Sequence, residues 1–167
     1  VEFYGSTEGN VNFFNLDGKI GAVGRIPRLL RSKLKGRIVK FDVETEEPVR
    51  GADGLCIEAD PDEPGEAVGP ITGEPRQRFD GYNDEQQSKK KLLRDVFVKG
   101  DLWFRTGDLM RMDADGYVYF ADRIGDTFRW KGENVSTSEV EIAISSMPGV
   151  KHAIVYGVQV PGQDGRA

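Results

Sequence analysis

A short polar block near the start of the chain has the residue types that a phosphate-binding loop needs. It reads Phe3-Tyr-Gly-Ser-Thr-Glu-Gly9. Glycine beside serine and threonine lets backbone and hydroxyl donors approach a phosphate closely. A neighbouring carboxylate can bind Mg²⁺, which commonly bridges phosphates with one or two protein oxygens, and an aromatic ring offers a flat face to a nucleobase. Taken alone, the block is more typical of a polar turn after a strand.

Asp108 and Arg123, much later in the chain, have the chemistry to bind a ribose. Asp108 ends the sequence Thr106-Gly-Asp108, and a carboxylate at the end of a strand accepts hydrogen bonds from both hydroxyls of a sugar. Arg123 follows Asp122 and offers planar, directed donors. Arg123 is also suited to a salt bridge with Asp108 or Asp122, and such a pair would preposition both groups.

The third informative block is Asp122-Arg-Ile-Gly-Asp-Thr-Phe-Arg-Trp-Lys-Gly-Glu-Asn-Val135. The three blocks, in this order, resemble the late motifs of the adenylate-forming acyl-CoA synthetases. Residues 126–135 are most similar to the fatty acid transport protein / very-long-chain acyl-CoA synthetase branch. The resemblance extends from Val1 to Ala167. It implies ATP-dependent activation of a long or very long fatty acid to acyl-AMP and pyrophosphate, then thioester formation with CoA, with fatty acid uptake as an associated role.

The resemblance also implies roles for single residues in the first two blocks. It puts Tyr4 against the adenine, brings Gly5 to the nucleotide and Thr7 to its phosphates, and makes Glu8 the ligand of Mg²⁺. Catalytic contacts are thereby assigned to Thr7 and Glu8. Ribose binding is assigned to Asp108 and Arg123. ATP, Mg²⁺ and CoA are the cofactors and co-substrates that the resemblance implies, and a fatty acid is the acyl substrate.

For the third block, the resemblance implies a hinge followed by a moving loop. Gly125 and Asp126 fall at the interdomain hinge, where glycine has the conformational range that a rotation needs. The loop of Trp130, Lys131 and Gly132 is expected to reach the active site for the thioester step. Gly132 is expected to lie near the pantetheine thiol.

The elements that must position these residues indicate an α+β fold. Residues 1–124 are expected to be a β-rich, distorted barrel-like end of a large AMP-binding domain. Residues 125–167 are expected to be the hinge and the start of a small α+β C-terminal domain. The expected strands are 37–43, 55–59, 66–71, 103–106, 109–112 and 117–120, with turn character at 44–53 and 60–65. A helix is predicted over 83–98 from the apolar face of Leu92, Leu93, Val96 and Phe97. Gly116 is expected to have a positive φ in the turn before Tyr117.

The small domain is predicted from a helix signal after the third block. Ser136 and Glu139 have capping-box spacing, and Val140, Ala143, Ile144 and Met147 fall on one helical face. Pro148 and Gly149 should end the helix. A short strand is expected at 153–156.

Composition limits the classes of function. Hydrophobic residues make up 38% and charged residues 31% of the chain, which suits a soluble globular protein. The net charge of −5 disfavours a nucleic-acid partner. No apolar run approaches the roughly 20 residues that cross a bilayer.

Basic clusters lie within 25–37 and at Lys89 to Lys91. They are typical of a solvated face, or of a contact with anionic lipid or CoA phosphates, which leaves peripheral membrane association open. The single cysteine, Cys56, indicates a reducing, cytoplasmic location and a structural rather than nucleophilic thiol.

Two alternatives remain at this point. One is an adenylation enzyme that loads another carboxylate onto a carrier protein, and the other is a non-catalytic nucleotide- or lipid-binding module. Both ends of the chain read as cuts through a larger protein. The Gly/Ser/Thr-rich phosphate loop and the C-terminal catalytic Lys of the family fall outside it. We therefore expect residues 1–167 alone to have little or no turnover. Acyl chain length, transport and oligomeric state are not readable from these residues.

Overall fold

The computed structural model describes residues 2–6, 11–27, 29, 35–72, 85–131 and 133–161. Within these ranges the chain is rich in strands and has two helices. In chain order the elements are β1 (Glu2–Gly5), β2 (Asn12–Asn15), β3 (Gly24–Arg25), β4 (Arg37–Asp42), β5 (Glu47–Pro48), β6 (Gly65–Pro70), α1 (Glu85–Lys90), β7 (Leu92–Arg94), β8 (Leu102–Met112), β9 (Tyr117–Arg123), β10 (Thr127–Trp130), β11 (Glu133–Ser136) and α2 (Thr137–Ser145). The β-rich α+β class expected from the sequence is confirmed.

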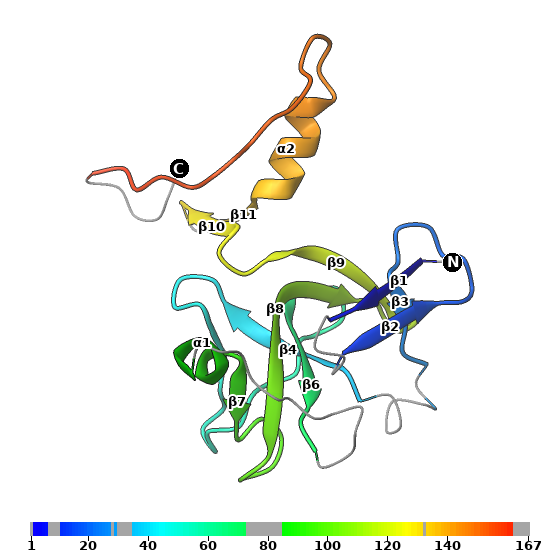
Figure 1. Cartoon of the computed structure of the whole chain (residues 1–167), viewed down its shortest axis with the longest axis vertical. Helices are drawn as coiled ribbons and strands as arrows, with labels where there is room; N and C mark the ends of the chain where they lie inside the picture. Colours follow the sequence, from blue (N-terminus) through cyan, green and yellow to red (C-terminus); the bar gives the residue numbers. More distant parts are fainter. Residues whose placement is uncertain are drawn as a thin grey trace.

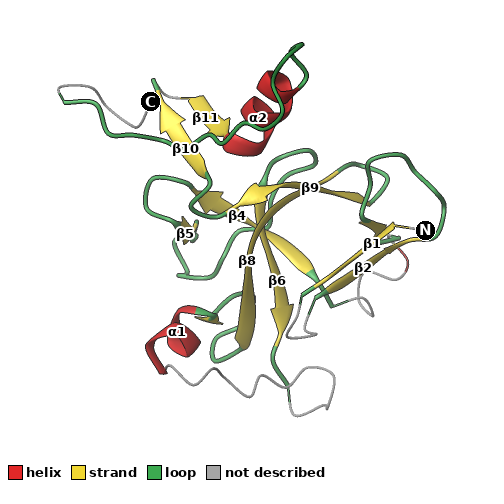
Figure 2. Ribbon diagram, turned by 45° about the horizontal axis from the view of Figure 1, so that its top comes forward, coloured by secondary structure: helices red, strands yellow, loops and turns green. Residues whose placement is uncertain are grey.

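A seven-stranded antiparallel sheet forms the body of the molecule (Figure 1). Its strand order is β3-β9-β8-β6-β4-β5, and β7 pairs with β8 beside this path. The order has two ends, at β3 and β5, so the sheet is open where a barrel-like arrangement was expected. Two further antiparallel pairs are not hydrogen-bonded to its strands. They are the β1–β2 hairpin, and the β10–β11 hairpin that leads into α2 (Figure 2).

Strand β8 is the centre of the sheet and organises the candidate site. The sequence predicted two short strands here, but the structure has one strand of 11 residues. Along one edge β8 pairs with β6. Along the other it pairs first with β7, through residues 102–104, and then with β9, through residues 108–112. The two predicted pieces are therefore the two halves of one strand, separated by an irregularity at Thr106 to Asp108.

The core lies on both faces of the sheet because neighbouring strand residues point to opposite sides. Ile38 belongs to one buried cluster, which includes Phe13, Met110 and Val118 and is shared with the β1–β2 hairpin. Its neighbour Val39 belongs to the other cluster, on the opposite face.

That second cluster contains Val68, Leu93 and Val96 together with Cys56. Burial raises the pKa of the Cys56 thiol. This agrees with its interpretation as a structural cysteine.

The helix predicted over 83–98 is wrong beyond Lys90. Residues 92–94 form β7 instead, and the segment after it is a turn in which Asp95 has a φ of 54°. The Asp101 carboxylate accepts hydrogen bonds from the N–H groups of Val96 (2.6 Å), Phe97 (3.0 Å) and Val98 (3.1 Å). Pairing with β8 and these bonds satisfy backbone groups that a helix would otherwise use. The apolar pattern is buried all the same, through Leu93 and Val96.

Two predicted strands are also absent from the described residues. Residues 55–59 make only isolated bridges, of Cys56 with Arg50 and of Glu58 with Val39. Residues 153–156 have no strand partner among the described residues and remain extended chain. β-branched and apolar composition favours an extended conformation, but a strand also needs a neighbouring edge with which to pair.

Several local predictions are confirmed. β4 spans Arg37–Asp42, and the predicted turn leads into β9 with Gly116 at a φ of 85°. The turn-rich stretch 44–53 also contains the two-residue strand β5. Ser136 caps α2 by accepting a hydrogen bond from the N–H of Glu139, and the helix ends before Pro148.

The predicted apolar face of α2 is poorly buried. Val140 and Ile144 are only half-buried, and Ala143 and Met147 are exposed. Neither described helix has the length and apolar character that crossing a bilayer requires.

Candidate nucleotide site

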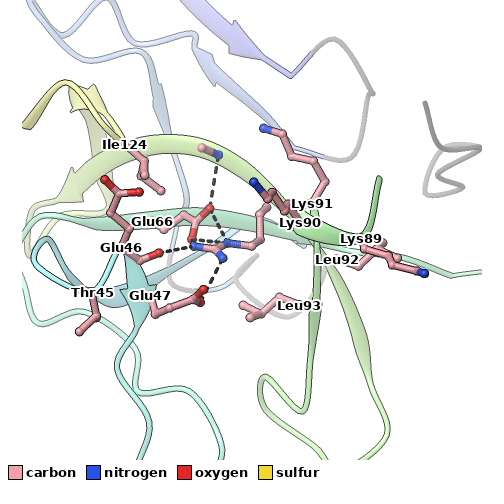
Figure 3. A pocket seen from close by; sticks show the side chains of 12 residues that line it. Thr45, Glu46, Glu47, Glu66, Lys89, Lys90, Lys91, Leu92, Leu93 and Ile124 are labelled. Carbon is pink, nitrogen blue, oxygen red and sulfur yellow. Dashed lines mark hydrogen bonds and ion pairs between the residues drawn. The ribbon is translucent and has the colours of Figure 1, made fainter. Parts of the chain in front are cut away.

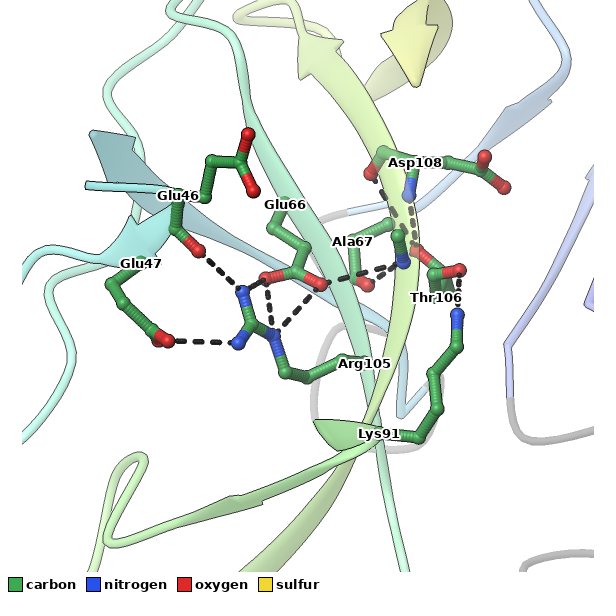
Figure 4. A network of polar contacts seen from close by, with 9 residues as sticks. Glu46, Glu47, Glu66, Ala67, Lys91, Arg105, Thr106 and Asp108 are labelled. Carbon is green, nitrogen blue, oxygen red and sulfur yellow. Dashed lines mark hydrogen bonds and ion pairs between the residues drawn. The ribbon is translucent and has the colours of Figure 1, made fainter. Parts of the chain in front are cut away.

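A bulge in β8 sets the direction of the Asp108 side chain. Val68 of β6 pairs with Arg105, and Glu66 pairs with Leu109, so residues 106–108 lie opposite Ala67 alone. The Thr106 hydroxyl donates to the carbonyl of Ala67 at 2.7 Å and accepts from the N–H of Asp108 at 3.1 Å. These contacts are visible in Figure 4. Such bulges commonly re-aim a side chain next to a functional site.

Asp108 meets both residues that the sequence linked to the same nucleotide. The β8–β9 register puts Asp108 directly opposite Arg123, and their side chains form an ion pair with 3.4 Å between Oδ1 and Nε. The Tyr4 hydroxyl donates to Oδ2 of Asp108 at 2.5 Å, from β1. The Tyr4 ring packs on Phe13, with centroids 5.9 Å apart. Of the two salt bridges suggested for Arg123, the one with Asp108 forms.

A cavity of about 530 Å³ opens over this cluster. It is lined by Tyr4, Gly5, Ser6, Lys91, Thr106, Gly107, Asp108, Arg123 and Ile124. Its volume falls within the range of small-molecule sites. The fold therefore brings together four of the residues assigned to ATP, namely Tyr4, Gly5, Asp108 and Arg123, from β1, β8 and β9. Thr7 and Glu8 lie outside the described residues.

The hinge and loop residues lie elsewhere. Gly125, with a φ of 94°, and Asp126 form the turn after β9, and the N–H of Ile124 donates to the Gly107 carbonyl at 2.9 Å. Trp130 ends β10, and the Lys131 ammonium lies 5.3 Å from the centroid of its ring. Neither Trp130 nor Lys131 lines the cavity. Gly132 lies outside the described residues.

Lys91 is a site residue that the sequence did not single out. Its Nζ donates to the Thr106 carbonyl at 2.9 Å and lies 5.7 Å from the centroid of the Phe104 ring. Lys91 borders both the candidate nucleotide cavity and a second cavity of about 450 Å³, which Figure 3 shows. The sequence marked it only as part of a basic run. Its position depends on the β7–β8 pairing, which no local pattern reveals.

The buried ion pair of Glu66 and Arg105 contacts the backbone of the bulge at Gly107. The Glu66 side chain is fully buried, and both of its carboxylate oxygens accept from Nε of Arg105, at 3.1 and 2.9 Å. Burial raises the pKa of the Glu66 carboxyl, and the Arg105 charge acts against that rise. Oε1 of Glu66 also accepts from the N–H of Gly107 at 3.3 Å.

Arg105 has a second acidic partner, Glu47, at 3.1 Å (Figure 4). One signal in the sequence could have marked Glu66 as the buried acidic member of the Glu66–Arg105 pair. Glu66 is a charged residue within an apolar strand, and a buried charge requires a partner.

The residues described here contain no group of three or more side chains suited to a metal ion. The predicted ligand of Mg²⁺, Glu8, is outside them, so the structure does not test the fit of that ion. The cavity itself offers a carboxylate, a guanidinium, an ammonium and a phenol. That set suits a ligand with hydroxyls and negative charge.

Comparison with known proteins identifies relatives over the whole chain. The chain matches no protein-family model. It is 49% identical to long-chain fatty acid transport protein 1 of Mus musculus, over 99% of this chain and 26% of that protein. It is 49% identical to long-chain fatty acid transport protein 2 of Rattus norvegicus, again over 99% of this chain and 26% of that protein. The chain thus spans about a quarter of the length of these relatives.

Solved structures share the fold. The unliganded O-succinylbenzoate coenzyme A synthetase of Bacillus subtilis superimposes with a TM-score of 0.61 at 22% identity, over 98% of this chain and 31% of that one. The same enzyme in complex with ATP and a magnesium ion gives a TM-score of 0.60 at 25% identity, over 98% of this chain and 30% of that one. Sequence and fold together confirm the resemblance found in the three motif blocks. The chain is a relative of the long-chain fatty acid transport proteins over about a quarter of their length, and its fold is that of the coenzyme A synthetases.

Proposed function

We propose that the protein containing this chain is an ATP-dependent fatty acid–CoA ligase. In the proposed reaction, a long or very long fatty carboxylate attacks the α-phosphorus of ATP, giving acyl-AMP and releasing pyrophosphate. The CoA thiol then attacks the acyl carbon and displaces AMP. Activation is needed because a carboxylate is a poor acyl donor until one of its oxygens becomes part of a good leaving group. Uptake of the fatty acid would follow from trapping it as the thioester.

The observation that carries this proposal is the cluster of Asp108, Arg123 and Tyr4 at one cavity. The Asp108 carboxylate is only 13% exposed and is already oriented by the Tyr4 hydroxyl and the Arg123 guanidinium. Such a preoriented acceptor can bind two ribose hydroxyls with little reorganisation. Arg123 is 72% exposed, which leaves its guanidinium accessible to a ligand. In this proposal Asp108 and Arg123 bind the ribose, and Tyr4 and Gly5 border the nucleotide.

The remaining roles belong to the same proposal. Thr7 would contact the phosphates, and Glu8 would hold Mg²⁺, which would supply charge neutralisation to the phosphates when bound. Residues 1–124 would form the end of the large domain and residues 125–167 the start of the small one. Gly125 and Asp126 would act as the hinge between them, and the loop of Trp130, Lys131 and Gly132 would serve the thioester step with CoA.

We also propose a cytoplasmic location with peripheral contact to a membrane. Cys56 is a buried free thiol, as expected in a reducing compartment. The proposed substrate is a membrane-soluble fatty acid, and exposed basic residues such as Lys89 and Lys90 suit anionic headgroups.

The test is ATP–pyrophosphate exchange by the full-length protein with fatty acids from short to very long, followed by acyl-CoA formation when CoA is added. Asp108→Asn should lower kcat/KM for ATP by about 100-fold, because it weakens charge-assisted hydrogen bonds to the ribose. Asp115→Asn is the matched control, since Asp115 is an exposed residue of the turn before β9. It should leave exchange unchanged.

Three results would contradict the proposal. Exchange with a non-fatty carboxylate and transfer to a carrier protein would identify a different adenylation enzyme. ATP binding without exchange would identify a non-catalytic module. Equal effects of Asp108→Asn and Asp115→Asn would remove Asp108 from the site.

A further inference from the structure

Asp122 is a buried carboxylate whose donors lie on both sides of the turn at Gly125. It sits in β9 and is 2% exposed. Its Oδ1 accepts from the N–H of Arg123 at 2.9 Å and from the hydroxyl of Ser138 at 2.9 Å. Its Oδ2 accepts from the hydroxyl of Thr127 at 3.0 Å. One side chain of the main sheet therefore binds the first residue of β10 and the second residue of α2.

These contacts fix one arrangement of the segment after the turn. A buried carboxylate is costly unless its oxygens are hydrogen-bonded, so Thr127 and Ser138 are held in place by the need to satisfy Asp122. A second contact supports the same arrangement from β10, where Nη1 of Arg129 lies 3.7 Å from Oε1 of Glu44. Gly125, between the two sides, has no atom within 4 Å of the position that a Cβ would occupy. Side-chain packing therefore does not hold the turn at Gly125, and its contacts are the backbone hydrogen bonds of Ile124 with Gly107 and of Asp126 with Arg123.

In this arrangement the hairpin β10–β11 is away from the nucleotide cavity. The residues that line the cavity come from β1, the segment after it, Lys91, β8 and the end of β9. None of the described residues of β10, β11 or α2 is among them. Instead, Thr127, Phe128 and Arg129 border a separate cavity of about 240 Å³ with Val43, Glu44 and Glu46.

We propose that Asp122 is a positioning residue that latches β10, β11 and α2 in the arrangement where the hairpin loop is outside the nucleotide cavity. The inference rests on the proposed function, in which that loop must approach the cavity for the thioester step. Rotation about Gly125 then requires the hydroxyls of Thr127 and Ser138 to leave the carboxylate. Hydroxyl–carboxylate bonds can be exchanged for bonds to water, which makes such a latch reversible. Asp122 is also the neighbour of Arg123, so the latch and the ribose contact share one strand end.

The experiment uses the full-length protein with Thr127→Val, Ser138→Ala and the double variant. Two quantities are measured: hydrogen exchange of the backbone amides at residues 124–127, and the separate rates of the two half-reactions. The half-reactions are ATP–pyrophosphate exchange with a fatty acid and conversion of preformed acyl-AMP and CoA to acyl-CoA. Each single variant should speed amide exchange and shift the ratio of rates toward the thioester step by about tenfold, the scale of one hydrogen bond to a charged group. The double variant should shift it further.

Two controls separate the latch from a merely structural role. Ser145→Ala changes an exposed serine of the same helix and should alter neither quantity. Thr127→Ser retains the hydroxyl and should keep the ratio close to that of the unchanged protein. If both half-reactions fall equally, or if the variants behave like Ser145→Ala, the latch is wrong. If the full-length protein shows neither half-reaction with any acid, the proposed function fails, and amide exchange alone then decides whether Asp122 holds the segment.

Discussion

The regions on the two sides of Gly125 are stabilised by different kinds of contact. Before it, the sheet buries side chains such as Phe104, Met110 and Val118, which are fully inaccessible. After it, large apolar side chains are exposed: Ile142 at 71%, Ile154 at 84% and Tyr156 at 72%. Phe128 and Thr137 are the buried residues described in this second region. Its connections to the sheet include the hydrogen bonds to Asp122 and the ion pair with Glu44.

This difference shows how two successive regions of one chain can be held by contacts of different kinds. Apolar burial is non-directional and accumulates over many atoms, so the sheet that carries Asp108 and Arg123 is held strongly. Hydrogen bonds and ion pairs are directed and exchangeable with water, so they can define one orientation without making it permanent. All of the described residues that line the candidate nucleotide cavity belong to the first region.

Core truncation gives the largest expected difference between the two regions. Phe104→Ala should lower the free energy of unfolding by about 3–5 kcal/mol, because it leaves a cavity in the sheet. Tyr156→Ala should change it by less than about 0.5 kcal/mol, because the side chain is exposed. Denaturant unfolding of the full-length protein measures both. Equal losses would mean that the second region has a packed core of its own, and the contrast would fail.

A pH-dependent effect is expected from the loop that precedes β8. Partial burial acts to raise the pKa of the Asp101 carboxyl, but hydrogen bonds from Phe97, Val96, Trp103 and Val98 outweigh it, and the pKa is lowered. A lowered folded-state pKa contributes stability above the ordinary Asp value of about 3.9, and that stability is lost as the pH falls through the folded value. Asp101→Asn should therefore cost about 1–2 kcal/mol at neutral pH.

The difference between Asp101→Asn and the unchanged protein should shrink on acidification below about pH 4, near the ordinary Asp pKa. Unfolding measured at several pH values tests this, with Asp115→Asn as the control. A difference that stays constant with pH would show that the carboxylate charge is not what stabilises the loop.

The smallest effect is expected at the start of α2. Ser136→Ala removes the side chain that accepts from the N–H of Glu139 at 3.3 Å. The expected cost is about 1 kcal/mol. Because α2 has little apolar support, amide exchange should rise throughout the helix and remain unchanged in β8. A rise in β8 as well would mean that the two regions unfold together.

Local signals in the sequence were read correctly where the neighbouring residues alone decide the structure. The cap of Ser136 depends on a residue three positions away, and the positive φ of Gly116 depends on one tight turn. The helix predicted over 83–98 failed because its apolar spacing also suits a strand followed by a turn. The carboxylate of Asp101 and the edge of β8, both downstream, decided between them.

For the candidate site, the residue types indicated the chemistry, and the pairing of the strands determined which side chains lie next to each other. The motif blocks predicted that Tyr4, Gly5, Asp108 and Arg123 share a ligand, and all four border one cavity. The roles of these residues, and of Thr7, Glu8 and Gly132, remain predictions. Lys91 had only the signal of a basic run, and Arg105 had none. Their positions follow from strands that pair far apart in the sequence.

The sequence by itself determined the resemblance to the fatty acid transport proteins, the residue types of the candidate site and the caps and turns, because each depends on identity and short spacing. Only the tertiary structure decided that Thr106 to Asp108 form a bulge opposite Ala67. It alone also decided that Glu66 and Arg105 support that bulge, and that Asp122 joins β9 to β10 and α2. The physical reason is that strand register and buried polar pairing are long-range. They are selected by which backbone edges and which charges meet when the whole sheet forms.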